Sequence, residues 1–188
     1  ILPGQGQYYN PDFHMMDGSK KQKEGYVSDV IEDVSENWLS NRDPNKPFCL
    51  VIGHKATHRT WIPDAQVMGK YDHISFPLPH NFYDNYTNRE AAKVQDMTIS
   101  KTMQMGYDLK MFGTENEANK EGTIMRMNPE QRQKFDAYYG AVNADLKSRN
   151  LSGKELIEWK YQQYMRDYLS TAASLDRNIG RTLDYLKE

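Results

Sequence analysis

KPFCLVIGHKATHRTWIPD, residues 46–64, places a short apolar run directly before a cluster of basic and aromatic side chains. The run FCLVI lies between Pro47 and Gly53. Its length and boundaries predict a strand that is buried on both faces of a parallel sheet. Ligand sites in such sheets lie beyond the carboxyl ends of the strands. We therefore expect the residues that follow this strand to form the functional site.

The length of 188 residues suits one domain or a large piece of a bigger one. Its 24 Lys and Arg nearly balance its 26 Asp and Glu, so the net charge does not indicate a nucleic-acid partner. No apolar stretch approaches the ~20 residues that cross a membrane, so no membrane partner is expected either. The single cysteine, Cys49, lies inside the apolar run and is expected to be a buried structural residue.

Four parts follow one another along the chain. Residues 1–25 are rich in glycine, proline and tyrosine, which predicts an extended loop region. Residues 26–64 contain apolar side chains at helical spacing up to position 39, then the strand and the candidate site loop. Residues 65–150 are an excursion with helices, and residues 151–188 carry one long amphipathic helix. A helix that leads into a buried strand is typical of the α/β class.

Local signals place the helices of the second half. A helix is expected over about 89–105, followed by a polar loop at 113–123. Asn128 is a suitable cap and Pro129 suits a first helical position, so another helix begins there. Ser152 and Glu155 have the spacing of a capping box at the start of the last helix.

The six residues HKATHR concentrate His54, Lys55, His58 and Arg59. Such a group of donors suits a sulfate, phosphate or carboxylate, and histidine can protonate a leaving oxygen near neutral pH. The alternative is a surface turn that is simply basic. A zinc pair of His54 and His58 is disfavoured, because helical spacing does not apply after a strand. Trp61 is either a platform for a sugar ring or a packing residue.

The same segment resembles the KPFFLxLxHKAPHxPWxP stretch of the formylglycine-dependent sulfatases, especially the branch that acts on glycosaminoglycans and N-acetylglucosamine 6-sulfate. Three other segments are similar to that family in the same order: LPGQGQYYNPDF, GYVSDVIEDVSENWL and YLSTAASLDRNIGRTLDYLKE. The resemblance covers nearly the whole chain. It implies an alkaline-phosphatase-like α/β fold, a parallel sheet flanked by helices, of which this chain is the central portion.

The resemblance further implies a sulfatase that removes sulfate from a sulfated carbohydrate, in an exported or periplasmic location. It makes His58 the catalytic residue, as a sulfate ligand and proton donor. The substrate-binding residues would be His54, Lys55, Arg59 and Trp61. Thr57 and Thr60 stand where the family has prolines. Calcium and formylglycine are expected in the complete enzyme, but no CxPSR motif and no metal ligands are expected in this chain, whose partner is the remainder of the sulfatase domain.

Two alternatives stay open. One is a related phosphoester or phosphonate hydrolase of the alkaline phosphatase superfamily, because sulfate and phosphate esters share a shape. The other is a non-catalytic glycan-binding fragment, because the nucleophile and metal ligands are missing. We expect the chain alone to be inactive and weakly stable, since the edges of its strand would be exposed. The sugar, the position of the sulfate and the oligomeric state are left open.

Overall fold

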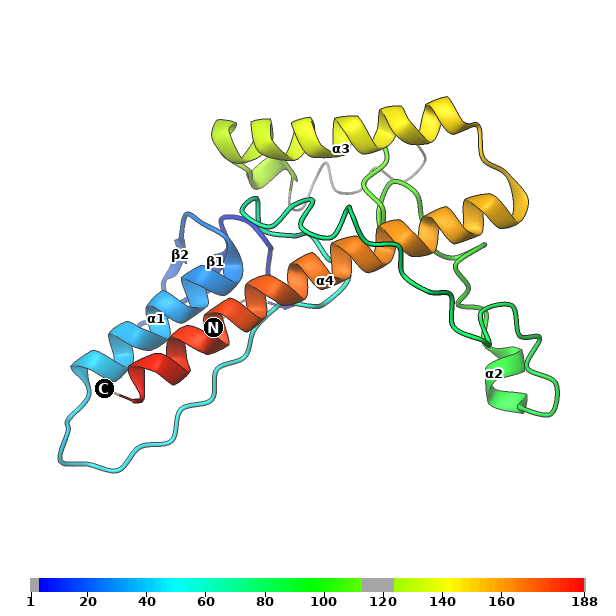
Figure 1. The fold of residues 1–188 in the computed structure, drawn as a ribbon. Coiled ribbons are helices and arrows are strands. Elements are labelled where there is room, and N and C mark those ends of the chain that lie inside the picture. Colours follow the sequence, from blue (N-terminus) through cyan, green and yellow to red (C-terminus); the bar gives the residue numbers. More distant parts are fainter. Residues whose placement is uncertain (1–3, 113–123, 188) are drawn as a thin grey trace.

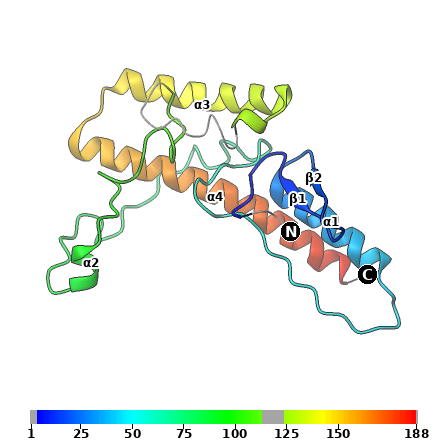
Figure 2. The same ribbon diagram turned by 180° about the vertical axis from the view of Figure 1, so that it is seen from behind.

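The computed structural model describes residues 4–112 and 124–187, and Figure 1 shows a largely helical arrangement. The elements in chain order are β1 (Asp12–His14), β2 (Lys20–Gln22), α1 (Val27–Asn41), α2 (Glu90–Val94), the 3₁₀ turn η2 (Ile124–Arg126), α3 (Pro129–Arg149) and α4 (Gly153–Tyr185). In both views α3 runs beside the first half of α4, and α1 lies along its second half (Figures 1 and 2). Within the described ranges, none of these helices has the length and apolarity needed to span a membrane.

The extended region predicted for residues 1–25 contains a small antiparallel hairpin. In it, Asp12 pairs with Gln22 and Phe13 pairs with Lys21. The hairpin is the one sheet found in the described parts of the chain, and it contains two strands. The parallel sheet predicted from the sequence is therefore not formed by these residues.

The prediction of a buried strand at 48–52 is wrong for this structure. The segment contains no assigned strand, and Val51 is 88% exposed. Cys49, which was expected to be buried, is exposed as well. A parallel strand needs neighbouring strands for its N–H and C=O groups, and the described residues place none beside this segment. Figure 1 accordingly shows the segment after α1, in cyan, as a long loop that extends away from the helices and then returns to them.

The helix predicted at the start of the helix–strand unit is confirmed as α1. Its apolar face is buried against the hairpin and the loop beyond it. Its polar face meets α4, where the guanidinium of Arg181 reaches Asp33 at 2.7 Å and Glu36 at 2.8 Å. Arg177 of α4 bridges Asp29 at 2.5 Å and Asp64 at 2.7 Å. Ion pairs therefore fix how α1 and α4 lie along each other.

The predicted start of α3 is confirmed, because Asn128 caps the helix and exchanges hydrogen bonds with Gln131. The helix expected over 89–105 shortens to α2, which buries none of its residues, and the rest of that segment consists of turns and irregular backbone. An exposed helix with no packed face gains little beyond its weak intrinsic propensity. The predicted polar loop at 113–123 lies outside the described residues.

The long final helix is confirmed as α4, but its predicted capping box is not formed. Ser152 occupies the N-cap position and its side chain makes no capping hydrogen bond. The helix is instead held by tertiary contacts along its length, including the ion pairs with α1. Packing of this kind supplies most of the stability of helices in proteins.

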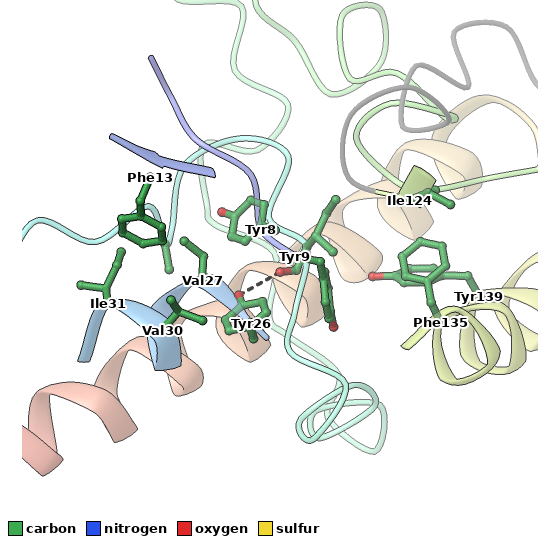
Figure 3. Close-up of a cluster of buried hydrophobic side chains, with 12 residues drawn as sticks. Tyr8, Tyr9, Phe13, Tyr26, Val27, Val30, Ile31, Ile124, Phe135 and Tyr139 are labelled. Atoms are coloured by element: carbon green, nitrogen blue, oxygen red, sulfur yellow. Dashed lines mark hydrogen bonds between the residues drawn. The ribbon is translucent and has the colours of Figure 1, made fainter. Parts of the chain in front are cut away.

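The core gathers around three tyrosines that lie between α1, α3 and the chain after residue 54 (Figure 3). The rings of Tyr8 and Tyr26 stack with centroids 6.0 Å apart, and Tyr9 meets Tyr26 edge-on at 5.4 Å. Phe135 and Tyr139 bring α3 into the same cluster, and both are fully buried. The aromatic core therefore supports the segment that carries the candidate site.

Candidate active-site loop

Residues 54–64, called here the active-site loop, contain no helix or strand and are held by side chains from elsewhere. Burial raises the pKa of each core tyrosine, so all three hydroxyls remain protonated donors at neutral pH. Each hydroxyl donates to a main-chain carbonyl of the loop: Tyr8 to His58, Tyr26 to Ile62 at 2.9 Å, and Tyr9 to Pro63 at 2.9 Å. The dashed line in Figure 3 marks the bond from Tyr26.

A buried ion pair supplies a further anchor. The ammonium of Lys110 donates to the main-chain carbonyl of Trp61 at 3.0 Å and to Asp167 at 2.9 Å. The other carboxylate oxygen of Asp167 accepts hydrogen bonds from Tyr139 and Gln163, each at 3.0 Å. Burial lowers the pKa of Lys110, and the adjacent Asp167 carboxylate opposes that shift. Four side-chain donors therefore fix the backbone of the loop between positions 58 and 63.

His54, Lys55 and His58 line one cleft, and their catalytic and substrate-binding roles stay predictions. The cleft has a volume of about 740 Å³, and its lining also includes apolar side chains of α1, among them Val34 and Trp38, and those of residues 50–52. A cleft of this size is ample for a monosaccharide, because small-molecule sites typically measure about 300–1,000 Å³.

His58 is exposed, and its ring is oriented by its own loop. Its Nδ1 lies 2.5 Å from the carbonyl oxygen of Arg59. A carbonyl oxygen can only accept, so Nδ1 carries the proton in this contact. In the neutral ring Nε2 is then the acceptor nitrogen, and in the protonated ring it is a second donor. His58 therefore keeps one ring nitrogen for a substrate.

Lys55 and His54 have less aqueous surroundings. The ammonium of Lys55 donates to the carbonyl of Gln5 at 2.9 Å and lies over the ring of Tyr8, 4.8 Å from its centroid. Burial lowers the pKa of both Lys55 and His54. Nδ1 of His54 is buried, and no hydrogen-bond partner for it is found within the described ranges. A half-buried imidazole of this kind favours the neutral form.

Arg59 and Trp61 are placed differently, because neither belongs to the lining of the cleft. Arg59 makes a bidentate pair with the buried Asp108, with N···O distances of 2.6 and 2.7 Å. The Trp61 ring packs edge-on against Tyr164 of α4, with centroids 4.8 Å apart. Their role as substrate contacts stays a prediction. In the structure, the contacts with Asp108 and Tyr164 hold the loop to its surroundings.

The residues that hold the loop were not predicted from the sequence. Tyr8 and Lys110 lie far from it along the chain, and nothing in their local sequence marks them. Asp167 did carry a signal, because it interrupts the otherwise apolar and aromatic face of α4 next to Tyr164 and Tyr168. A carboxylate in that position needs a buried cationic partner.

The residues that the structure describes do not fit the metal or the modified nucleophile that the resemblance implies. Over 4–112 and 124–187, no group of three or more His, Cys, Asp or Glu side chains could hold a metal ion. The cleft offers cationic and imidazole nitrogens, whereas calcium takes oxygen ligands. Cys49 is exposed, and it is not followed by the proline and arginine of a CxPSR motif.

Comparison with known proteins gives a consistent result. The family model described as Sulfatase matches residues 3–188. The chain is 44% identical over 198 residues to an N-acetylglucosamine-6-O-sulfatase of Bacteroides thetaiotaomicron, an alignment that covers 100% of this chain and 35% of that protein. N-acetylglucosamine-6-sulfatases of Capra hircus and Bos taurus are each 26% identical over 92 residues, covering 47% of this chain and 16% of theirs.

A solved structure superposes closely on the whole chain. That structure, a complex of its protein with the substrate D-glucosamine-2-N,6-O-disulfate, matches with a TM-score of 0.90 and 44% identity. The match covers 100% of this chain and 40% of the solved one. The chain therefore spans well under half the length of these proteins.

Proposed function

The chain belongs to the sulfatase family, and we propose that it is the central part of an enzyme that removes sulfate from a glucosamine-containing glycan. The observation that carries this proposal is the cleft where His54, Lys55 and His58 meet. A sulfate ester presents oxygens that these nitrogens can bind through charge-assisted hydrogen bonds. The names of the similar proteins, which specify N-acetylglucosamine 6-sulfate or a sulfated glucosamine, support the choice of sugar.

The roles of the residues follow from their surroundings. His58 has one ring nitrogen committed to the loop and one left for the substrate, so it can bind a sulfate oxygen and deliver a proton to the departing sugar hydroxyl. Lys55 places a cation beside the same cleft, which stabilises negative charge that develops on the sulfate. The half-buried His54 contributes a neutral ring at the wall. Arg59 and Trp61 are retained as candidate sugar contacts at the edge of the loop.

The remaining chemistry belongs to other parts of the protein. We propose that formylglycine and calcium are supplied from outside this chain. Its sequence contains no CxPSR motif, and no group of side chains that could hold a metal ion is found over 4–112 and 124–187. The isolated chain should then be inactive. An exported location, periplasmic in a bacterium, is proposed from the family resemblance, and cell fractionation with a specific antibody tests it.

The test uses the complete protein, incubated in parallel with N-acetylglucosamine 6-sulfate and N-acetylglucosamine 6-phosphate. Release of inorganic sulfate, with much slower release of phosphate, is the expected result. Preferential release of phosphate would support the phosphoester hydrolase instead. Saturable binding of the sulfated sugar without release of either anion would support a non-catalytic glycan-binding protein.

A further inference from the structure

We propose that Lys110 and Asp167 are positioning residues that set the active-site loop, an inference that rests on the function proposed above. Lys110 reaches the carbonyl of Trp61 at 3.0 Å, three residues beyond His58. At that point the loop has no regular secondary structure to define its path. The ammonium group therefore supplies the hydrogen-bond donor that a neighbouring strand would otherwise provide.

Burial of this pair is costly, which argues for a specific use. The side chain of Lys110 is 0% exposed and that of Asp167 is 1% exposed. Replacement of a buried ion pair by apolar residues of similar size is often neutral or stabilising, so stability alone does not account for such a pair. The carboxylate is also fixed in orientation by Tyr139 of α3 and Gln163 of α4. Both long helices thereby determine where the Lys110 ammonium points.

The path from Lys110 to the catalytic histidine is short. The amide N–H of Trp61 donates to the carbonyl of His58 at 3.1 Å. Trp61 is thus tied to Lys110 through its carbonyl and to His58 through its amide. Release of the carbonyl frees this turn to shift, and a displacement of about 1 Å in a catalytic group can lower the rate about 10²-fold.

The first experiment compares Lys110→Met with Lys160→Met in the complete protein, with N-acetylglucosamine 6-sulfate as substrate. Lys160 is a matched control, because its ammonium also donates to main-chain carbonyls, of which that of Met103 lies at 3.1 Å, and none of these carbonyls belongs to the active-site loop. Lys110→Met should lower kcat about 10- to 100-fold with KM changed less than about twofold. Lys160→Met should leave kcat within about twofold. Equal kcat values in the two variants would overturn the proposal.

A double variant separates positioning from simple stability. Lys110→Met leaves Asp167 buried without its partner, so the Tm falls. The double variant Lys110→Met/Asp167→Asn removes both charges, and its Tm should recover toward that of the parent protein. Its kcat should stay low, because the Trp61 carbonyl still has no donor. Recovery of kcat together with Tm would show that the pair is only structural.

A third measurement does not depend on activity. Hydrogen–deuterium exchange of the amides in 54–64 should accelerate in Lys110→Met and remain unchanged in Lys160→Met. Unchanged exchange in Lys110→Met would overturn the positioning role, whatever the protein hydrolyses. A parent protein that releases no sulfate, but shows the accelerated exchange in Lys110→Met, would overturn the proposed function and support the positioning of the loop.

Discussion

The hydroxyl of Tyr8 donates a hydrogen bond to the main-chain carbonyl of His58, 50 positions further along the chain. The ring of the same tyrosine lies beneath the ammonium of Lys55, 4.8 Å away. One side chain from the N-terminal segment therefore contacts two residues of the proposed sulfate site. The segment before the hairpin and the active-site loop behave as one structural unit.

Replacing Tyr8 by Phe tests this unit, because the change keeps the ring and removes only the hydroxyl. We expect the free energy of unfolding to fall by about 1 kcal/mol, the usual net value of one hydrogen bond, and kcat to fall several-fold. Tyr9→Phe is the control, since it removes an equivalent hydroxyl bonded to Pro63. Urea unfolding and steady-state kinetics measure both effects. Equal losses of kcat in the two variants would argue against a special role for Tyr8.

His58→Ala in the complete protein should reduce the rate of sulfate release about 10²- to 10⁴-fold, because it removes the proposed proton donor. The Tm should change little, since the His58 side chain is exposed. His73→Ala provides the control, as His73 is also exposed and does not belong to the lining of the cleft. A normal rate in His58→Ala would remove this residue from the mechanism.

Arg59→Lys distinguishes a structural role from a substrate contact. Lysine keeps the charge but loses the bidentate geometry toward Asp108. The Arg59 side chain is 45% exposed, so we expect a modest loss of about 0.5–1 kcal/mol in unfolding free energy. KM for the sulfated sugar should change less than about twofold. A several-fold rise in KM, without loss of stability, would instead support direct contact with the sugar.

Titration of His54 should contribute to the change of protein stability with pH. Burial lowers its pKa below the ordinary value of 6.5. The unfolded chain then takes up the proton at a higher pH than the folded chain does, so the folded state loses stability as the pH falls from above 6.5 toward the lowered value. His54→Gln should flatten the fall of Tm between neutral and mildly acidic pH. An identical profile in the variant would show that His54 does not contribute.

The outlying segment 48–53 leads to a prediction about residues 1–188 produced alone. Val51 is 88% exposed and Phe48 is 44% exposed, so the isolated chain should bind a dye that reports apolar surface. Val51→Lys should weaken the dye fluorescence. Val94→Lys, at a 76% exposed position on the separate helix α2, should weaken it less. A cooperative melt with no dye binding would contradict this prediction.

Local signals in the sequence predicted α1, α3 and α4 and singled out the candidate loop. Asn128 and Pro129 define the start of α3 through contacts within one turn, and HKATHR concentrates its chemistry in six consecutive residues. The strand at 48–52 was predicted wrongly, because a strand exists only through its partners and the described residues provide none. Tyr8 and Lys110 were missed for a related reason. Their importance comes from loop carbonyls about fifty positions away, which no local pattern encodes.

The residues that flank the stretch from 65 to 107 form ion pairs with arginines. Asp64, just before it, is paired with Arg177 at 2.7 Å, and Asp108, just after it, is paired with Arg59 at 2.6 Å. No residue between these two ion pairs belongs to the lining of the cleft. A change of length within 65–107 should therefore leave the residues that line the cleft in place, because the two ion pairs hold the chain on either side of it.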